Sequence, residues 1–377
     1  METCLASIII PTNRGPDLAT TLVSVCRQER VPNDFEVLVI ENGAKSGAER
    51  IVEAVSTTYP QRRLRYVYEP TPGLLAGRHR GAVEAAGSLL IFVDDDIDVS
   101  PHWLESIVET FTDRTIDLIG GRILARYESK PPSWLQSFWG PAPHGGSGCG
   151  YLSLLDLGEQ EAPVDANFVW GLNFSIRAPV LRELGGFHPD NLPDDLQHFQ
   201  GDGETGLTIK ANEAGLRAVY QPQALVHHRI PASRLTTAYF RRRAFYQGVC
   251  DSFTAIRRDP ADAAAPALDP EPARAGFDAT SRSRRRPVVS LFARKWRRSE
   301  NASPERESTR EPGPEDVHAE VDGALKLGFE FHRAAVAESS VLLEWVHRKD
   351  YWDYRMPDVR LSRRIRGIQA RALARPH

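Results

Sequence analysis

The feature that most constrains the fold is a regular alternation of short apolar runs and helix-period segments over residues 5–125. Four apolar runs are predicted to be strands, at residues 7–10, 36–40, 64–68 and 89–93. Segments with apolar residues at helical spacing follow each of them. Continuous apolar strands that alternate with helices are typical of a parallel sheet with both faces covered. The sequence therefore predicts an α/β unit whose ligands bind beyond the carboxyl ends of the strands.

Beyond residue 125 the pattern is more mixed. Residues 166–176 look extended and residues 216–220 look like a short strand, whereas residues 204–214, 235–249 and 321–346 have helical character. Residues 257–318 hold eight prolines and no sustained period, which indicates a flexible linker or a loosely ordered insertion. We therefore expect a domain over residues 1–250 with halves 1–125 and 126–250, a Pro/Arg-rich linker or insertion over 251–318, and a C-terminal helical segment over 319–377.

Composition excludes several classes of protein. The 377 residues carry 47 Lys and Arg against 50 Asp and Glu, a formal net charge of −3, which argues against a nucleic-acid coat protein. The four cysteines are far apart in the sequence and fit reduced thiols better than a disulfide framework. Because no long apolar run and no secretory signal are visible, we expect a cytoplasmic protein.

Carboxylates crowd the end of the fourth predicted strand, where Asp94, Asp95, Asp96 and Asp98 follow Val93. Like charges at such a spacing are unfavourable unless a cation or protons compensate them. A hard divalent ion with oxygen ligands, Mg²⁺ or Mn²⁺, would do so and commonly bridges substrate phosphates. The alternative interpretation is a solvated acidic turn.

Several short motifs occur in an order that resembles the family 2 glycosyltransferases. They are Ser-Ile-Ile-Ile-Pro-Thr-Asn-Arg at 7–14, Val-Leu-Val-Ile-Glu-Asn-Gly at 37–43, Gly-Arg-His-Arg-Gly at 77–81, Phe-Val-Asp-Asp-Asp at 92–96 and Gly-Asp-Gly-Glu at 201–204. The resemblance covers about residues 5–250. It implies the GT-A fold, a Rossmann-like nucleotide-binding α/β domain with a mainly parallel sheet. It also implies metal-dependent, inverting transfer of a sugar from a nucleoside diphosphate, with a UDP-sugar as one donor to test.

The resemblance assigns the donor side of the site to seven residues: Pro11, Thr12, Arg14, Glu41, Arg78, Asp94 and Asp95. Arg78 would contact the diphosphate, since its guanidinium suits phosphate oxygens. Glu41 stands where the family more often has Asp, and the alternative is that Glu41-Asn42-Gly43 is merely a turn. His79 also departs from the family, which usually has Asn after the arginine.

The same resemblance implies that Asp96, with Asp94, holds the metal and that His228 completes the site or touches the diphosphate. Asp202 would be the catalytic base, although Gly201-Asp202 replaces the usual Glu-Asp pair. Glu204 would be its partner or the acidic charge at the start of the following helix.

Three residues are expected on the acceptor and sugar side: Trp170, Asn173 and Glu204. Trp170 could stack on a sugar, or it could pack into the core.

Other interpretations remain open at this stage. Asp96 and Asp98 imitate the nucleophile strand of haloacid-dehalogenase phosphatases, and a non-catalytic nucleotide-sugar-binding module is a further alternative. The basic residues of 282–298 could contact an anionic membrane peripherally or belong to a solvated linker. The acceptor is expected to be a hydroxyl of a glycan, a lipid-linked sugar or a small molecule, and no nucleic-acid partner is expected.

Overall fold

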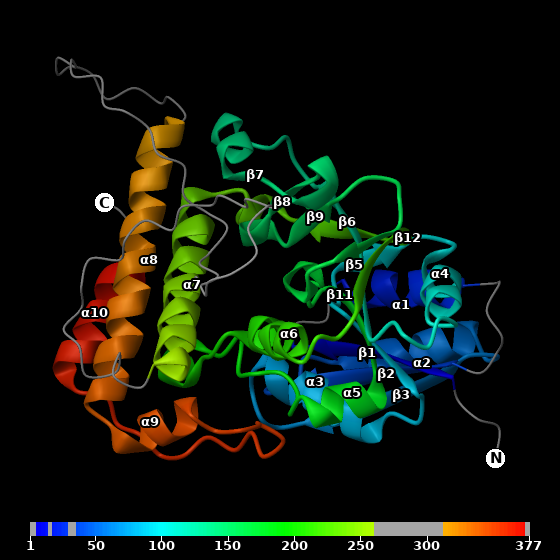
Figure 1. Cartoon of the computed structure of the whole chain (residues 1–377), viewed down its shortest axis with the longest axis horizontal. Coiled ribbons are helices and arrows are strands. Elements are labelled where there is room, and N and C mark those ends of the chain that lie inside the picture. Colours follow the sequence, from blue (N-terminus) through cyan, green and yellow to red (C-terminus); the bar gives the residue numbers. More distant parts are fainter. Residues whose placement is uncertain (1–4, 14–16, 29–34, 260–311, 374–377) are drawn as a thin grey trace.

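The computed structural model describes residues 5–13, 17–28, 35–259 and 312–373 (Figure 1). One mixed sheet runs through the molecule, and its strands occur in the order β3-β2-β1-β4-β11-β6-β9-β8-β7. The strands of its main part are β1 (Ala6–Thr12), β2 (Phe35–Asn42), β3 (Arg63–Glu69), β4 (Leu89–Val93), β6 (Leu118–Tyr127), β11 (Asn173–Arg177) and β12 (Ala218–Ile230). The shorter strands are β5 (Ile97–Val99), β7 (Gly140–Pro141), β8 (Ser147–Cys149), β9 (Leu154–Asp156) and β10 (Ala162–Val164).

The first four long strands are all parallel, as the alternation of the sequence predicts. β1 is buried along its whole length, and its successive side chains enter opposite layers of the core. Ile8 and Ile10 pack with α1 (Leu18–Cys26), α2 (Ala48–Thr58) and α4 (Trp103–Thr110). Ile9 packs with α3 (Leu74–Glu84), α5 (Ala178–Glu183) and α6 (Gly203–Glu213). The period-2 geometry of a strand thus explains why such runs are apolar without interruption.

The second half of the sheet differs from the sequence prediction. β11 runs antiparallel to both β4 and β6, and β12 pairs with β6 in parallel over a length far beyond residues 216–220. Residues 166–176 are not continuously extended, because Ala166–Phe168 form a short 3-10 turn before β11 begins. The carboxylate of Asp165 accepts a hydrogen bond from the Asn167 amide and stabilises that turn.

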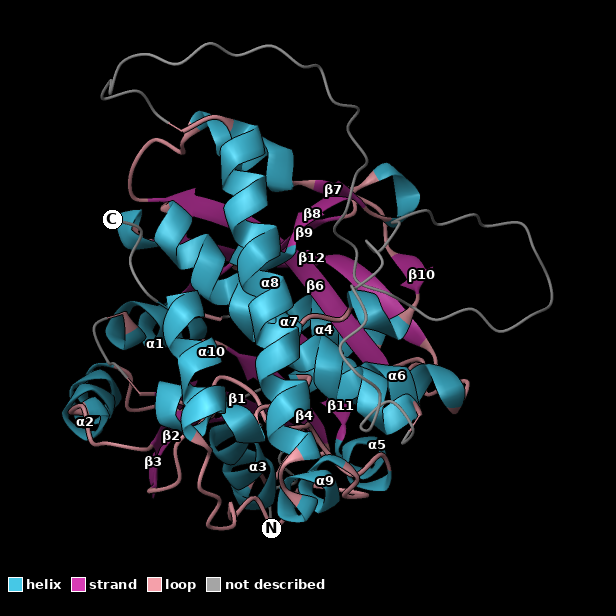
Figure 2. Cartoon of the chain, turned by 90° about the vertical axis from the view of Figure 1, so that its left-hand side faces the viewer, coloured by secondary structure: helices cyan, strands magenta, loops and turns pink. Residues whose placement is uncertain are grey.

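The C-terminal part of the chain packs against the sheet domain. It consists of α7 (Thr237–Arg258), α8 (Pro314–Ala337), α9 (Ser340–Val346) and α10 (Arg363–Leu373), and Figures 1 and 2 show α7, α8 and α10 side by side on one flank of the molecule. The expected domain boundaries at 250 and 318 therefore fall inside helices. Pro314 occupies the first turn of α8, where its missing N–H costs nothing. Residues 260–311, the rest of the expected linker, lie outside the described residues.

α7 and α8 run in the same direction and approach closely through two glycines. A Cβ atom at Gly248 would lie 2.0 Å from the carbonyl oxygen of Leu325, and one at Gly328 would lie 1.9 Å from that of Phe245. Only glycine permits this separation. Within the described ranges, no helix combines the length and the apolar character needed to cross a bilayer.

Candidate active site

Asp94, Asp95 and Asp96, called the aspartate triplet below, lie at the end of β4, between this strand and β5. Thr12 is the last residue of the neighbouring strand β1, and its hydroxyl donates a hydrogen bond to the carboxylate of Asp95. Burial and the charges of Asp94 and Asp96 raise the pKa of Asp95 to about 7. Burial and Asp96 also raise the pKa of Asp94. This end of the sheet is therefore a place where added positive charge would be strongly favoured.

Asp96 faces two basic side chains from the far end of β12 and the turn after it. Arg234 donates to one carboxylate oxygen at 2.7 Å, and Nε2 of His228 lies 3.4 Å from the other. Although burial opposes ionisation, His228 and Arg234 hold the pKa of Asp96 below its ordinary value. Asp96 is therefore an ionised carboxylate in an almost fully enclosed position.

Asp96 and His228 are two potential ligands of a divalent cation. Oδ1 of Asp96 is buried and has no hydrogen-bond partner among the described residues. Nδ1 of His228 donates to the carbonyl oxygen of Leu152 at 2.9 Å, so Nε2 is the ring nitrogen that faces Asp96. A guanidinium nitrogen of Arg234 lies 2.8 Å from this Nε2, and within the described residues no group of three His, Cys, Asp or Glu side chains is arranged to hold a metal ion.

A second charged cluster lies beside the triplet. The buried Arg78 of α3 contacts Asp190 at 3.2 Å and Glu204 of α6 at 3.3 Å. The other oxygen of Glu204 accepts from the amide of Gly171 at 3.3 Å. The charge of Asp94 acts on both Arg78 and Asp190, so the two clusters form one electrostatic unit.

Asp190 is a site residue that the sequence reasoning missed. Burial and the charges of Glu204 and Asp94 raise the pKa of its carboxyl to about 7, and its Oδ1 is buried without a hydrogen-bond partner in the described structure. A Cβ atom at Gly203 would lie 2.9 Å from Oδ2 of Asp190, so this glycine makes room for the carboxylate. The sequence offered one signal for it: Asp190 follows Gly185-Gly186 closely, in a stretch whose apolar residues show neither helical nor strand spacing.

Both carboxylate oxygens of Asp202 are engaged by other side chains. Its Oδ1 lies 2.6 Å from Nδ1 of His188, and its Oδ2 accepts the hydroxyl proton of Thr254 on α7 at 2.7 Å. These contacts hold the pKa of Asp202 below its ordinary value even though burial opposes ionisation. Asp202 immediately precedes α6, and Glu204, two residues later, is the acid that reaches Arg78. The structure thus separates two acids that the sequence motif presents together.

Glu41 is occupied at the start of α2. One oxygen accepts from the amides of Ser46 and Gly47 and from the Ser46 hydroxyl, and the other accepts from the Tyr66 hydroxyl at 2.5 Å. Although burial opposes ionisation, the bonds from Tyr66 and Ser46 lower the pKa of Glu41 to about 2. The structure therefore places this carboxylate as a cap for α2, where an anion is favourable, rather than as a free group at the strand end.

The expected acceptor-side residues are also held internally. Asn173 is buried, accepts from the indole N–H of Trp103 at 3.0 Å and donates to the carbonyl of Ala224 at 2.7 Å. Trp170 is half-buried against the core and donates to the carbonyl of Asn167 at 3.1 Å. Trp170 therefore fits the packing alternative, and Asn173 is bonded within the protein. Pro11 lies near the carboxyl end of the buried strand β1, and Arg14 lies outside the described residues.

His79 connects the C-terminal segment to the site. Its Nε2 accepts from the amide of Phe187 at 2.9 Å, so Nδ1 carries the proton and donates to the carbonyl of Tyr351 at 3.0 Å. Trp352 stacks on the imidazole with ring centroids 4.2 Å apart. Burial lowers the pKa of His79 to about 3, so the ring is neutral. The departure from the family's usual residue thus has a structural role beside Arg78.

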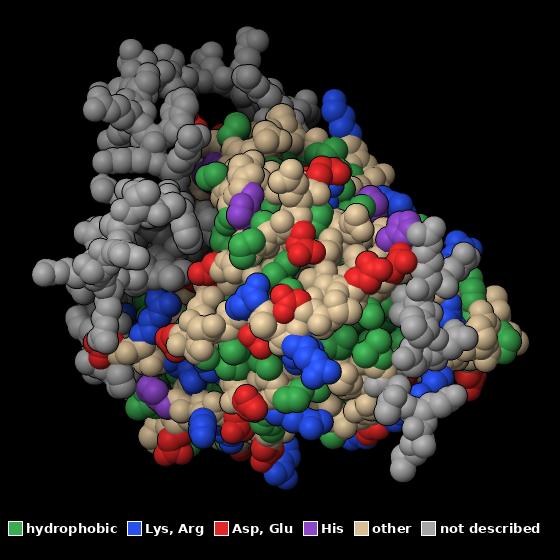
Figure 3. All heavy atoms as spheres, turned by 45° about the vertical axis from the view of Figure 1, so that its right-hand side comes forward, with side chains coloured by type: hydrophobic (Ala, Val, Ile, Leu, Met, Phe, Trp, Pro, Cys, Tyr) green, Lys and Arg blue, Asp and Glu red, His purple; other side chains and the backbone are tan. Residues whose placement is uncertain are grey.

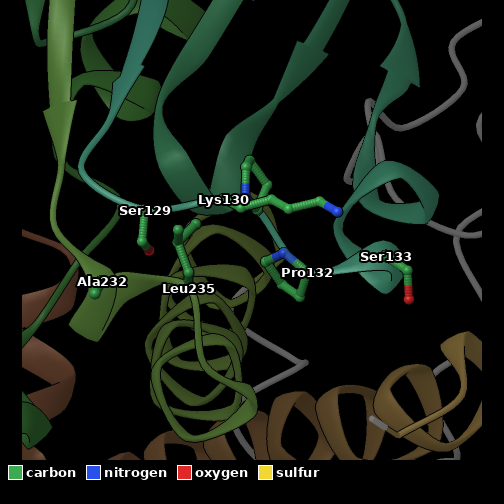
Figure 4. Close-up of a pocket in the computed structure, with 7 residues that line it drawn as sticks. Ser129, Lys130, Pro132, Ser133, Ala232 and Leu235 are labelled. Atoms are coloured by element: carbon green, nitrogen blue, oxygen red, sulfur yellow. The ribbon is translucent and has the colours of Figure 1, made fainter.

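A surface pocket of about 340 Å³ lies between the loop after β6 and the turn before α7 (Figure 4). Residues 129–133 line one wall, and Ala232 and Leu235 line the other. Arg234, which pairs with Asp96, belongs to the same turn. The pocket therefore includes a residue of the turn that carries Arg234, the ion-pair partner of Asp96.

Known proteins resemble this chain over about two thirds of its length. Glycosyltransferase AglE of Haloferax volcanii is 26% identical over 238 residues, which are 62% of this chain and 70% of that protein. Succinoglycan biosynthesis protein ExoM of Rhizobium meliloti is 29% identical over 254 residues, 66% of this chain and 74% of that protein. Pre-mycofactocin glycosyltransferase of Mycobacterium tuberculosis is 27% identical over 248 residues, 64% of this chain and 46% of that protein.

Among solved structures, a mannosyltransferase from Pyrobaculum calidifontis in complex with GDP-Man and Mn²⁺ aligns with a TM-score of 0.46 and 19% identity, over 67% of this chain and 64% of that one. The sequence profile described as "Glycosyl transferase family 2" matches residues 7–185. These residues include β1 to β4, the aspartate triplet and Arg78. The sequence motifs predicted a resemblance to this family, and the match confirms it for residues 7–185.

Proposed function

We propose that this glycosyltransferase moves a sugar from a nucleoside diphosphate to an acceptor hydroxyl, with a divalent metal at Asp96 and with Glu204 as the base. The observation that carries the proposal is the convergence of the triplet, Arg78 and Glu204 in one electrostatic unit at the end of β4. Ligands of such sheets bind at this edge.

The choice of Glu204 rests on access. Its side chain is 33% exposed, whereas that of Asp202 is 4% exposed. A base must reach the proton of an incoming hydroxyl, and of these two acids Glu204 is the accessible one. Asp202 instead fixes the start of the helix that carries Glu204.

In this mechanism Glu204 takes the proton from the acceptor hydroxyl as its oxygen forms a bond to the anomeric carbon. The bond between that carbon and the diphosphate breaks, and the electron pair leaves with the diphosphate. A single displacement of this kind inverts the anomeric configuration. Arg78 would orient the diphosphate through its planar guanidinium. Asp96 and His228, with Asp94 beside them, would hold Mg²⁺ or Mn²⁺, and the ion would neutralise charge on the leaving group.

The phosphatase alternative conflicts with the surroundings of Asp98. Its carboxylate is paired with Arg229 at 2.5 Å and also with Arg126. A phosphatase would need this acid free beside Asp96 to protonate a leaving group. The match to family 2 supports neither this alternative nor a non-catalytic module. We expect no release of nitrophenol from p-nitrophenyl phosphate in the presence of Mg²⁺.

The first test measures the melting temperature of the protein with each member of a panel of nucleoside diphosphates and nucleotide sugars, with and without MnCl₂. A donor should raise the melting temperature only with the metal present. The acceptors to screen next are glycans, lipid-linked sugars and small molecules, because the relatives' names include a polysaccharide and a small-molecule product. If no nucleotide shifts the melting temperature, the proposed donor site is wrong.

The base is tested by Glu204→Gln. We expect donor binding to persist and the transfer rate to fall by about 10²–10⁴-fold, the usual contribution of a general base. Glu213→Gln is the matched control, because Glu213 is an exposed acid on the same helix. Substantial transfer by the Glu204 variant would contradict the assignment.

A further inference from the structure

The last described helix, α10, has two chemically distinct faces. Ile365, Ile368 and Ala372 are buried against α7 and α8. Four exposed arginines occupy the opposite side: Arg363, Arg364, Arg366 and Arg371. At about 100° per residue they fall within an arc of about 160°. Gly367 and Ala370, also exposed, lie within this arc, so no bulky side chain separates the arginines.

The charge of this arginine face is not compensated by ion pairs within the described part of the chain. None of the four arginines forms an ion pair with a described residue, and residues 359–373 contain no acid. Asp194 meets α10 through its backbone carbonyl, which accepts from Gln369, but its carboxylate is already bonded to Arg242 and Tyr246. Like charges three and four residues apart on a helix are destabilising, so the sequence maintains the cluster at a cost.

The cluster is also not a consequence of overall composition. The whole chain carries a formal net charge of −3. On the face shown in Figure 3, Lys and Arg side chains are interspersed with Asp and Glu. The arginine face of α10 therefore carries charges of a single sign, in contrast to the mixed charges on the face shown in Figure 3.

We propose that the arginine face of α10 docks this enzyme on the phosphate groups of an anionic bilayer surface. Guanidinium groups bind phosphate oxygens with two parallel hydrogen bonds, which suits a surface of lipid phosphates. The apolar side of α10 is used inside the protein, so the contact is electrostatic adsorption and not insertion. No aromatic side chain lies on α10 to stack bases, which favours a bilayer over single-stranded nucleic acid.

The proposal is independent of residues 282–298, which lie outside the described structure, and of the chemistry at Glu204. It would place the enzyme where a lipid-linked acceptor is presented. Binding can be measured without transfer, so a failure of the docking proposal and a failure of the proposed function are distinguishable.

The test is cosedimentation of the full chain with phosphatidylcholine vesicles, with and without phosphatidylglycerol, at low and high salt. The test variant replaces four arginines with glutamine: Arg363→Gln, Arg364→Gln, Arg366→Gln and Arg371→Gln. A control with the same change of charge replaces four exposed arginines elsewhere: Arg50→Gln, Arg63→Gln, Arg114→Gln and Arg182→Gln. Circular dichroism and the melting temperature establish that both variants are folded.

We expect the wild type and the control to bind anionic vesicles at low salt and to be released at high salt. The α10 variant should lose about 100-fold or more in partition coefficient, since each basic residue near an anionic surface contributes about five-fold. Equal loss in both variants, full binding by the α10 variant, or equal binding to neutral vesicles would overturn the proposal. Binding of a fluorescent oligonucleotide through α10, without vesicle binding, would also overturn it.

Discussion

Replacement of Asp202 by asparagine would separate a stabilising role from a catalytic one. Asn keeps the size of the side chain but removes the charge that His188 and Thr254 contact at 2.6 and 2.7 Å. Hydrogen bonds to a buried charge contribute about 1.5–3 kcal/mol each. Asn can still form weaker bonds at both positions. We therefore expect the free energy of unfolding to fall by about 3 kcal/mol.

The assay is chemical denaturation followed by circular dichroism, with Glu213→Gln as the control on the same helix. The control should be close to the wild type, because Glu213 is exposed and forms no ion pair with a described residue. The folded Asp202 variant should retain more transfer activity than Glu204→Gln. Wild-type stability combined with abolished transfer would refute our reasoning and restore Asp202 as the base.

The pH dependence gives a second signature of the same contact. The pKa of Asp202 is held below its ordinary value of 3.8, so its stabilisation is present above that pH and is lost as the pH falls toward the folded pKa. Burial also lowers the pKa of His188 from 6.5, so protonation of the unfolded chain destabilises the protein below about pH 6.5. The variant keeps the His188 effect only. Its difference from the wild type should therefore be largest near neutral pH and narrow below about pH 4.

Gly328→Ala should lower the free energy of unfolding by about 1–3 kcal/mol, because its Cβ atom would lie 1.9 Å from the Phe245 carbonyl. Gly323→Ala in the same helix meets nothing within 4 Å and should raise that free energy by about 0.5–1 kcal/mol; equal effects in denaturation would contradict the close approach of α7 and α8. Trp352→Ala removes the ring stacked on His79 and should lower the free energy of unfolding by about 1–2 kcal/mol. The same variant should bind the donor more weakly in calorimetry. Unchanged stability and binding would show that this stack does not support α3.

The sequence was sufficient for the parts of the fold that depend on local pattern. β1, β2 and β4 each contain a continuous apolar run, and the motif after β4 points to one edge of a parallel sheet. β12 could not be read in full, because Pro222, His227 and Arg229 interrupt its apolar pattern. Its strand conformation depends on pairing with β6, which is remote in the sequence.

The site was predictable in position but not in detail. A motif fixes that Asp202 and Glu204 are near each other, but the first turn of a helix turns their side chains toward different neighbours. The role of Glu41 as a cap depends on Ser46 and Tyr66, and no short-range pattern joins these residues. Asp190 lies in an irregular segment whose course is set by contacts with α3 and α6. The assignments of Arg14 and of residues 282–298 stay predictions.

The close packing of α7 with α8 bears on how this enzyme can be divided. Phe245, Val249 and Phe253 share one buried cluster with Phe331 and Trp345. A recombinant fragment that ended near residue 250, as the extent of the family resemblance invites, would leave these aromatic surfaces open to water. Such a fragment is a candidate for aggregation. The segment that sequence similarity identifies is therefore shorter than the segment that is needed for independent folding.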